Sequence, residues 1–259
     1  QSIILLRIQT LEDNIIVRPA TAADSHYADT ITTEMAESAK ARGTGIAQRS
    51  PEYIKLKIEE GKSVIAITRD GTWVGFCYIE AWEHEKYVAN SGLIVSPPFR
   101  KSGVATEIKR KVFELSRKKY PNAKIFGLTT GLAVMKINSD LGYEPVTYSE
   151  LTTDEEFWKG CRSCVNFEIL TAKQRKNCMC TAMLFDPVEA EAKIKEAALK
   201  KTAVIADGEP EEERRQFKGN FKLFERWVRF KQFVLLKSWK KKQIEEGKKP
   251  SVMSFFFFW

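Results

Sequence analysis

The sequence predicts a mixed α/β domain from about residue 14 to 187, followed by a basic helical extension from 188 to 249. Two observations lead to this prediction. Short β-branched runs alternate with segments whose apolar residues recur at helical spacing, in the order β, α, α, β, β, β, α, β, α, β, β. After Pro187 the chain is charged and helix-prone, and it contains no comparable β-rich run. One large domain with an appendage also suits the length of 259 residues.

The first half of the domain begins with a strand that leads into a helix. In "NIIVRPATAAD" a threonine stands three residues before an aspartate, the spacing of a helix cap, so a helix is expected over about 22–40. A second, shorter helix is expected near 51–60. "SVIAITRDGTWVGFCYIEAW" then contains two β-rich runs joined by an Asp-Gly pair, which is a strong hairpin signal. "YVANSGLIV" predicts a third strand of this group.

In the second half, Val104, Ile108 and Val112 recur at helical spacing and predict a helix up to about Lys119, with Lys109 and the other basic residues on its surface. "KIFGLTT" predicts a buried strand, and "GLAVMKINSDLGY" predicts a short helix that a glycine ends. Two further strands are expected, near 163–170 and 178–185. They would form a Cys-rich β-hairpin within about 158–185.

The net charge of +8 favours anionic partners. The basic residues lie mainly in two helical stretches without a recognisable nucleic-acid-binding motif, so we expect no nucleic acid partner. A phosphate-bearing cofactor fits the charge equally well. The sequence has no run of about 18 apolar residues, and its short apolar opening is too brief for a signal peptide, so we expect a cytoplasmic protein.

The stretch "VSPPFRKSGVA", residues 95–105, is the most informative motif. A strand that ends at a proline-limited bend and continues as a helix presents free backbone N–H groups at the positive end of the helix dipole. Gly103 would let an anion approach the main chain, and Arg100 and Lys101 add charge, so a pyrophosphate is a natural ligand. A plain strand-to-helix turn is the alternative. The motif is not a P-loop, because Gly103 is not followed by Lys and a hydroxyl residue.

These residues resemble the acyl-CoA signature of the GCN5-related N-acetyltransferases (GNAT), in which Arg or Gln, two residues, Gly, one residue, and Gly or Ala follow a strand. "IVRPATAAD" and "LGYEPV" are similar to the start and the end of that family's domain. The resemblance covers about residues 14–150 and implies the GNAT fold, with a mixed sheet that splays at the acyl-CoA site. It also implies acetyl-CoA as co-substrate, bound by the residues Ile94, Val95, Arg100, Lys101, Ser102, Gly103, Val104, Ala105 and Thr106.

The catalytic groups depart from the family pattern. Asn138 stands where the family usually has a tyrosine, and we expect it as a catalytic residue whose amide donates a hydrogen bond to the coenzyme A sulfur; the strand before the signature carries no acid. For the base we favour Glu80, which strand alternation would align with Tyr78 and Trp82; Glu83 and His84 are second choices. A solvated hairpin tip would explain these acids equally well.

On the acceptor side the resemblance points to the loop "KARGTGIAQRS". Arg42 and Arg49 suit a carboxylate, because a guanidinium can donate two parallel hydrogen bonds to it, and Asn90 completes the predicted substrate-binding set. A surface loop with incidental arginines is the alternative.

The stretches "ANSGLIV", "FELSRKKYPNAKIFGLTTGLAVMKINSDLGYEPV" and "FWKGCRSC" also resemble a bacterial N-acetylglutamate synthase-like subgroup linked to arginine biosynthesis. This resemblance implies an acetyl-CoA-dependent N-acetyltransferase that acts on a small carboxylated amine, with glutamate as the best candidate. Two alternatives stay open: a protein or peptide N-acetyltransferase, and a non-catalytic CoA-binding interaction module.

Two features remain outside the resemblance. Four cysteines in two close pairs are compatible with a structural zinc site, although buried free thiols would show the same spacing: Cys161, Cys164, Cys178 and Cys180. The aromatic and basic tail within 188–249 could lie on an anionic membrane, but docking on its own domain or on a second subunit in a homodimer is favoured.

Overall fold

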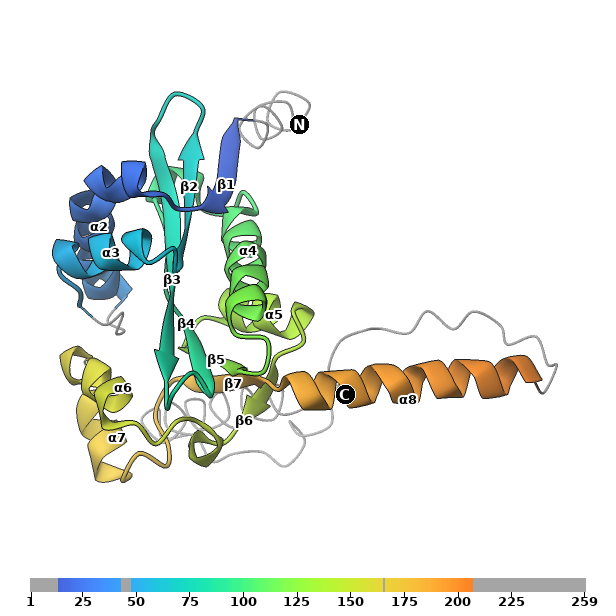
Figure 1. Ribbon diagram of the computed structural model, residues 1–259. Coiled ribbons are helices and arrows are strands. Elements are labelled where there is room, and N and C mark those ends of the chain that lie inside the picture. Colours follow the sequence, from blue (N-terminus) through green and yellow to red (C-terminus); the bar gives the residue numbers. More distant parts are fainter. Residues whose placement is uncertain (1–13, 43–47, 165, 207–259) are drawn as a thin grey trace, which may run out of the picture. The chain divides into compact units, whose positions relative to one another are not determined.

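The structure, a computed structural model, describes residues 14–42, 48–164 and 166–206 (Figure 1). The chain divides into two units, residues 1–209 and 210–259, and every described residue belongs to the first. Of the predicted basic extension 188–249, only the part up to residue 206 is described. The boundary at 187 therefore stays a prediction.

The first unit is built on a seven-stranded sheet with the strand order β1-β2-β3-β4-β5-β7-β6. All neighbouring strands are antiparallel except β4 and β5, which are parallel. The predicted mixed α/β fold is thereby confirmed. The strands are β1 (Ile15–Pro19), β2 (Ser63–Thr68), β3 (Trp73–Trp82), β4 (Tyr87–Val95), β5 (Lys124–Thr129), β6 (Glu144–Val146) and β7 (Thr181–Phe185).

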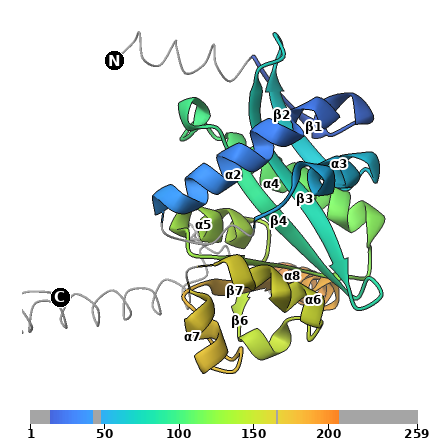
Figure 2. The ribbon, with the colours of Figure 1, turned by 90° about the vertical axis from the view of Figure 1, so that its left-hand side faces the viewer.

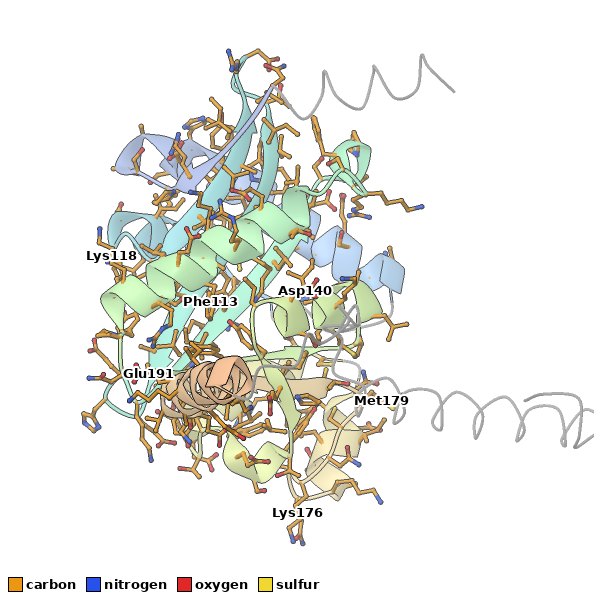
Figure 3. The ribbon with its side chains drawn as sticks, turned by 90° about the vertical axis from the view of Figure 1, so that its right-hand side faces the viewer. Phe113, Lys118, Asp140, Lys176, Met179 and Glu191 are labelled. Atoms are coloured by element: carbon orange, nitrogen blue, oxygen red, sulfur yellow. The ribbon has the colours of Figure 1, made fainter. Side chains whose placement is uncertain are left out.

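Helices cover both faces of the sheet (Figure 1). Helices α2 and α3 lie on one face, seen from the front in Figure 2, and α4 and α5 lie on the other. Figure 3 looks onto the α4 face, with Phe113 labelled on α4 and Asp140 on α5. The α-helices are α2 (Ala28–Arg42), α3 (Pro51–Glu59), α4 (Val104–Lys119), α5 (Leu132–Asp140), α6 (Glu155–Lys159), α7 (Phe167–Ala172) and α8 (Pro187–Ala206); the 3-10 turns are η1 (Ala22–Tyr27), η2 (Pro97–Phe99), η3 (Tyr148–Glu150) and η4 (Gly160–Ser163).

Three apolar clusters hold these layers together. Between the sheet and α4, the side chains of Val104, Ile108 and Val112 are buried, as their spacing predicted. On the opposite face, α2 and α3 bury Ile31 and Ile54 against the sheet. A third cluster packs beneath α6 and α7 and includes Phe126, Tyr148, Leu151, Trp158, Leu170 and Leu184.

Local signals in the sequence explain two of the elements. The Asp-Gly pair joins β2 to β3, and Gly71 has a φ of 86°, a left-handed conformation that glycine adopts readily. The predicted cap at Thr21 is a capping box, in which Asp24 accepts hydrogen bonds from the Thr21 backbone N–H at 2.7 Å and from its hydroxyl at 3.0 Å. Arg18 also binds the Asp24 carboxylate, at 2.7 and 2.8 Å.

The predicted Cys-rich β-hairpin is wrong. Between 155 and 172 the described residues form α6, η4 and α7, and β7 begins only at Thr181, after Cys178 and Cys180. Asp154 caps α6 by accepting a hydrogen bond from the Glu156 N–H at 2.9 Å. A short apolar run does not distinguish a strand from one helical turn, and here Leu170 is buried as part of a helix.

The penultimate strand is instead β6, three residues long, within the "LGYEPV" motif. It pairs with β7, which therefore lies between β5 and β6. Among the described helices none is both long and apolar enough to cross a membrane.

Candidate active site

Strands β4 and β5 diverge in the middle of the sheet. They pair only through residues 87–89 and 124–126, after which β4 continues to Val95 along β3, and β5 continues to Thr129 along β7. The predicted splay of the sheet is confirmed by this short register. A cavity of about 280 Å³ lies at the divergence, and residues from both faces of the sheet line it.

A β-bulge shapes β4 beside this cavity. Phe76 of β3 pairs with Ile94, whereas Tyr78 pairs with Ser91, so β4 carries one extra residue in the interval. Gly92 lies there with a φ of 66°, and a Cβ atom at this position would stand 2.3 Å from the Tyr78 ring and 2.9 Å from Met35 Cε. Only glycine satisfies both the backbone conformation and the close approach.

On the α2–α3 side, Glu80 is the centre of a cluster that we call the Glu80 cluster: Glu80, Arg49, Tyr53 and Tyr78. The Tyr53 hydroxyl donates a hydrogen bond to Glu80 Oε1, and Arg49 Nη2 lies 3.3 Å from the same oxygen. Arg49 Nε donates to the Tyr78 hydroxyl at 3.1 Å, and its guanidinium carbon lies 5.1 Å from the centre of the Tyr53 ring. Both donors contact Oε1, and the described residues give Oε2 no partner.

The environment fixes the protonation of the other cluster members. Burial, reinforced by the Glu80 carboxylate, raises the pKa of Tyr53 and of Tyr78 above the usual range of a phenol. Burial opposes the charge of Arg49, but Tyr78 and Glu80 outweigh it and raise the pKa of the guanidinium. Within the cluster, the Glu80 carboxylate is therefore the group suited to accept a proton.

The structure separates the two interpretations of the acidic stretch. Glu80 is 5% exposed and lines the cavity with Tyr78 and Trp82, so it is not part of a solvated hairpin tip. Glu83 lies at the turn between β3 and β4, where it accepts hydrogen bonds from Thr152 Oγ1 and the Thr153 backbone N–H, both at 2.7 Å. Glu83 thus holds the segment before α6.

On the α4–α5 side, a buried hydrogen-bond chain, which we call the Asn90 network, joins Tyr143, Asn90 and Ser116. The Tyr143 hydroxyl donates to Asn90 Oδ1 at 3.0 Å, and Asn90 Nδ2 donates to Ser116 Oγ at 2.7 Å. Asn90 lines the cavity, but these bonds occupy its amide. Its predicted role in substrate binding stays a prediction.

Asn138 lies on the same side and lines the cavity from α5. It is 1% exposed, and Nδ2 lies 3.7 Å from Met183 Sδ. Its Oδ1 atom is buried and has no hydrogen-bond partner among the described residues. An unpartnered buried acceptor in a cavity is suited to a ligand group or a water molecule.

Lys109 is a residue that the sequence interpretation misplaced on the helix surface. It is 2% exposed, lines the cavity and lies over the Tyr143 ring, with Nζ 5.4 Å from the ring centre. The signal was its spacing, because Lys109, Val112 and Ser116 follow the i, i+3, i+7 pattern of a buried helix face and all three are buried.

The predicted pyrophosphate loop connects β4 to α4. Lys101 and Gly103 both have a left-handed φ, of 66° and 83°, which turns the chain sharply before the helix. The Thr106 and Glu107 N–H groups donate to the Gly103 carbonyl, so the amides of Val104 and Ala105 precede the first intrahelical bond. A Cβ atom on Gly103 would meet no atom within 4 Å, so the main chain is open to an anion here.

The predicted CoA-binding side chains have their own partners within this loop. Arg100 Nε donates to the Val95 carbonyl at 2.9 Å, and Nη2 binds Glu34 at 2.9 Å and Ser38 at 2.8 Å, which ties the loop to α2. Ser102 Oγ donates to the Phe99 carbonyl at 2.6 Å. The loop thus offers main-chain amides, while the Arg100 guanidinium holds its conformation.

All four predicted metal ligands line the cavity, but the structure gives no support to the predicted zinc site: Cys161, Cys164, Cys178 and Cys180. Among the described residues, no group of three or more Cys, His, Asp or Glu side chains could hold a metal ion. The hairpin that would have paired the thiols is absent, and all four are free cysteines. Burial and the neighbouring cysteines raise the pKa of Cys161 to about 11 and that of Cys180 to about 12, so both stay protonated.

Of the two predicted acceptor-side arginines, Arg49 is within the Glu80 cluster. Arg42 is the last residue of α2, and its side chain lies outside the described part of the chain.

One comparison with known proteins gives a family match. Residues 32–135 match the model of the acetyltransferase (GNAT) family. A search of curated proteins found no match.

Several solved structures are similar to this chain at low identity. N-acetylglutamate synthase from Neisseria gonorrhoeae, complexed with coenzyme A and N-acetyl-glutamate, is 16% identical with a TM-score of 0.48; the alignment covers 66% of this chain and 35% of that one. Rv2747 from Mycobacterium tuberculosis, in complex with CoA and NLQ, is 15% identical with a TM-score of 0.47, covering 66% of this chain and 98% of that one. A phosphinothricin acetyltransferase from Sinorhizobium meliloti, in complex with AcCoA, is 16% identical with a TM-score of 0.45, covering 67% and 88%.

The chain thus spans about a third of the gonococcal synthase and nearly the whole length of the mycobacterial protein. The family match lies on the elements that form the cavity and the pyrophosphate loop, from α2 to the start of α5. Residues 32–135 therefore belong to an acetyltransferase domain of the GNAT family.

Proposed function

We propose that the protein transfers an acetyl group from acetyl-CoA to the amine of a small carboxylated acceptor, with glutamate as the best candidate, as a step of arginine biosynthesis. The observation that carries the proposal is the Oε2 atom of a buried Glu80, which accepts no hydrogen bond from the described residues, on the wall of a cavity between β4 and β5. A carboxylate placed in this way can remove a proton from an amine.

The donor would lie between the loop and the divergence of the strands. The amides of Val104 and Ala105 would bind its pyrophosphate, and the edge of β4 from Gly92 to Val95 would pair with its amide-bearing arm. When bound, acetyl-CoA supplies the activated acetyl thioester. The chain's own contribution is to orient the two substrates, to exclude water and to hold the acceptor amine beside Glu80.

Arg49 supports a carboxylated acceptor. Its guanidinium has five N–H donors, and the described residues take three of them, through Tyr78, Glu80 and the Gln48 carbonyl at 3.2 Å. The remaining donors can bind a carboxylate next to the group that accepts the amine proton. This proximity favours an α-amino acid, in which the carboxylate and the amine are close together.

The test is the rate of coenzyme A release from acetyl-CoA, followed by chromatography across a panel of amino acids, polyamines and short peptides. Glutamate should stimulate release most strongly, and the product should be the acetylated amino acid. Arg49→Lys should raise the KM for glutamate more than the KM for acetyl-CoA, whereas Lys159→Arg, at an exposed position of α6, should change neither. Stimulation by peptides or polyamines but not by amino acids would overturn the acceptor assignment.

A further inference from the structure

Lys109 is a buried amine for which the described part of the protein supplies no counter-charge. Its side chain lies inside the cavity wall at 2% exposure, and none of the hydrogen bonds or ion pairs of the described residues involves it. Buried ammonium groups are normally paired, because removing the charge from water is costly. The contact that the structure provides is the Tyr143 ring, which attracts a cation only moderately.

The groups around Lys109 do not supply the missing charge. Burial lowers the pKa of Lys109, and the Cys77 thiol of β3 is the one titratable group that opposes this effect. Cys77 is itself buried, and burial raises its pKa to about 11, so it stays a neutral thiol. The Tyr143 hydroxyl donates its hydrogen bond to Asn90, and burial raises the pKa of Tyr143 well above the usual value. The Lys109 amine is therefore available to interact with a group of a bound ligand.

We propose that Lys109 donates the proton to the coenzyme A sulfur as it leaves, which rests on the acetyl transfer proposed above. The acceptor nitrogen forms a bond to the acetyl carbon while the carbon–sulfur bond breaks and its electron pair passes to sulfur. The ammonium of Lys109 gives one proton to that sulfur and becomes a neutral amine. Glu80 takes the proton that the acceptor amine loses, and exchange with water restores both groups.

Lys109 suits this step better than its neighbours on the α4–α5 side. Asn138 occupies the position where the family has a tyrosine, but an amide can only donate a hydrogen bond and cannot release a proton. The hydroxyl of Tyr143 is committed to Asn90. An amine whose pKa is lowered toward that of a thiol makes proton transfer to sulfur more nearly balanced, which is the condition for effective general acid catalysis.

The experiment titrates the thiol of bound coenzyme A by the ultraviolet absorbance of its thiolate. The complex with desulfo-coenzyme A is the reference, because it cancels the absorbance of the protein's own cysteines. In the wild-type protein a cationic Lys109 should lower the pKa of the bound thiol, and Lys109→Met should raise it by about one unit or more. Lys111→Met, the same change on the same helix at a half-exposed ion pair with Glu114, should leave it unchanged.

Steady-state rates complete the test. Lys109→Met should lower kcat about a hundredfold with little change in the KM for acetyl-CoA, which is the size of a lost general acid. Lys109→Arg keeps the charge but does not give up its proton, so it should retain the lowered thiol pKa and still lose kcat.

Three results would overturn the proposal: equal thiol pKa values in the wild type and Lys109→Met, full kcat in Lys109→Arg, or an acetyl group recovered on Lys109 by peptide mass spectrometry. Failure of coenzyme A to bind at all would instead refute the proposed function, so the two failures are distinguishable.

Discussion

The two sides of the cavity differ in how their buried charged groups are paired. On the α2–α3 side, Glu80 is surrounded by an arginine and two phenols, so the carboxylate is compensated within the protein. On the α4–α5 side, the Asn90 network is neutral, and Lys109 and Asn138 Oδ1 lack partners among the described residues. The difference indicates that the first side is preorganised by the chain, whereas the second side leaves buried groups for a ligand to pair with.

The largest effect is expected at Gly92, which lies where the two sides meet. Gly92→Ala should lower the free energy of unfolding by about 3 kcal/mol, because the new methyl group clashes with Tyr78 and Met35 and a left-handed φ disfavours alanine. Urea denaturation measures the loss, and coenzyme A release should fall with it because Tyr78 positions Arg49. Gly131→Ala is the control, since its Cβ atom would come no closer than 3.6 Å to any atom. Equal stability of the two variants would show that the β-bulge at Gly92 shifts enough to accommodate the added methyl group without loss of stability.

The second largest effect is expected when the Glu80 carboxylate is removed. Glu80→Gln keeps the shape and the hydrogen bond from Tyr53 but cannot accept the amine proton, so kcat should fall about a hundredfold. The rate of coenzyme A release with glutamate measures this loss, and Glu85→Gln in the exposed turn is the matched control. If Glu80→Gln retains the wild-type kcat, the proton leaves by another path and the α2–α3 side is structural.

The third prediction disrupts the Asn90 network on the α4–α5 side by removing its central amide. Asn90→Ala should destabilise the fold by about 2 kcal/mol, because the hydroxyls of Tyr143 and Ser116 lose a buried partner. Asn122→Ala, in the exposed turn before β5, should cost much less. Thermal denaturation of both variants measures the difference, and a destabilisation no larger than that of Asn122→Ala would mean that water replaces the amide.

The smallest expected effect is on the pH dependence of the free energy of unfolding, which shows whether the Lys109 amine is paired in the folded protein. Burial lowers the pKa of Lys109 from its ordinary value of 10.5, so between the two values the unfolded chain binds more protons than the folded one. The free energy of unfolding therefore gains a contribution that rises with pH, which Lys109→Met should lack. The stability advantage of Lys109→Met over the wild type should shrink from pH 7 to about pH 10. A constant or growing advantage in urea denaturation would contradict the unpaired state.

Local signals in the sequence were enough to predict most of the fold. The Asp-Gly pair, the cap at Thr21 and the apolar stripe of α4 each depend on neighbouring residues, and the structure shows all three. Strand alternation likewise placed Glu80 beside Tyr78 on the cavity wall.

The predictions failed where contacts between residues far apart in the sequence determine the structure. Helices α6 and α7 form where their apolar side chains pack in one cluster with Phe126 and Leu184, which are distant from α6 or α7 in sequence. Lys109 lies on the buried face of α4, which its spacing with Val112 and Ser116 indicates, but a lysine is rarely fully buried, so its residue type favoured the surface. The partners of Arg100 in α2 were equally hidden, because they come from residues more than sixty positions earlier.

The short pairing of β4 with β5 has a further consequence for the behaviour of the protein in solution. From Asn90 to Leu93, β4 lines the cavity, and within the described chain no strand pairs with that edge from Asn90 to Val95. A free strand edge normally recruits other chains and promotes aggregation. Here α4 and α5 lie beside the divergence, so a second polypeptide strand would meet helices before it could align (Figure 3). Under the proposed function, the partner of this edge is a thin, linear, amide-bearing chain, the arm of acetyl-CoA, and not another β-strand.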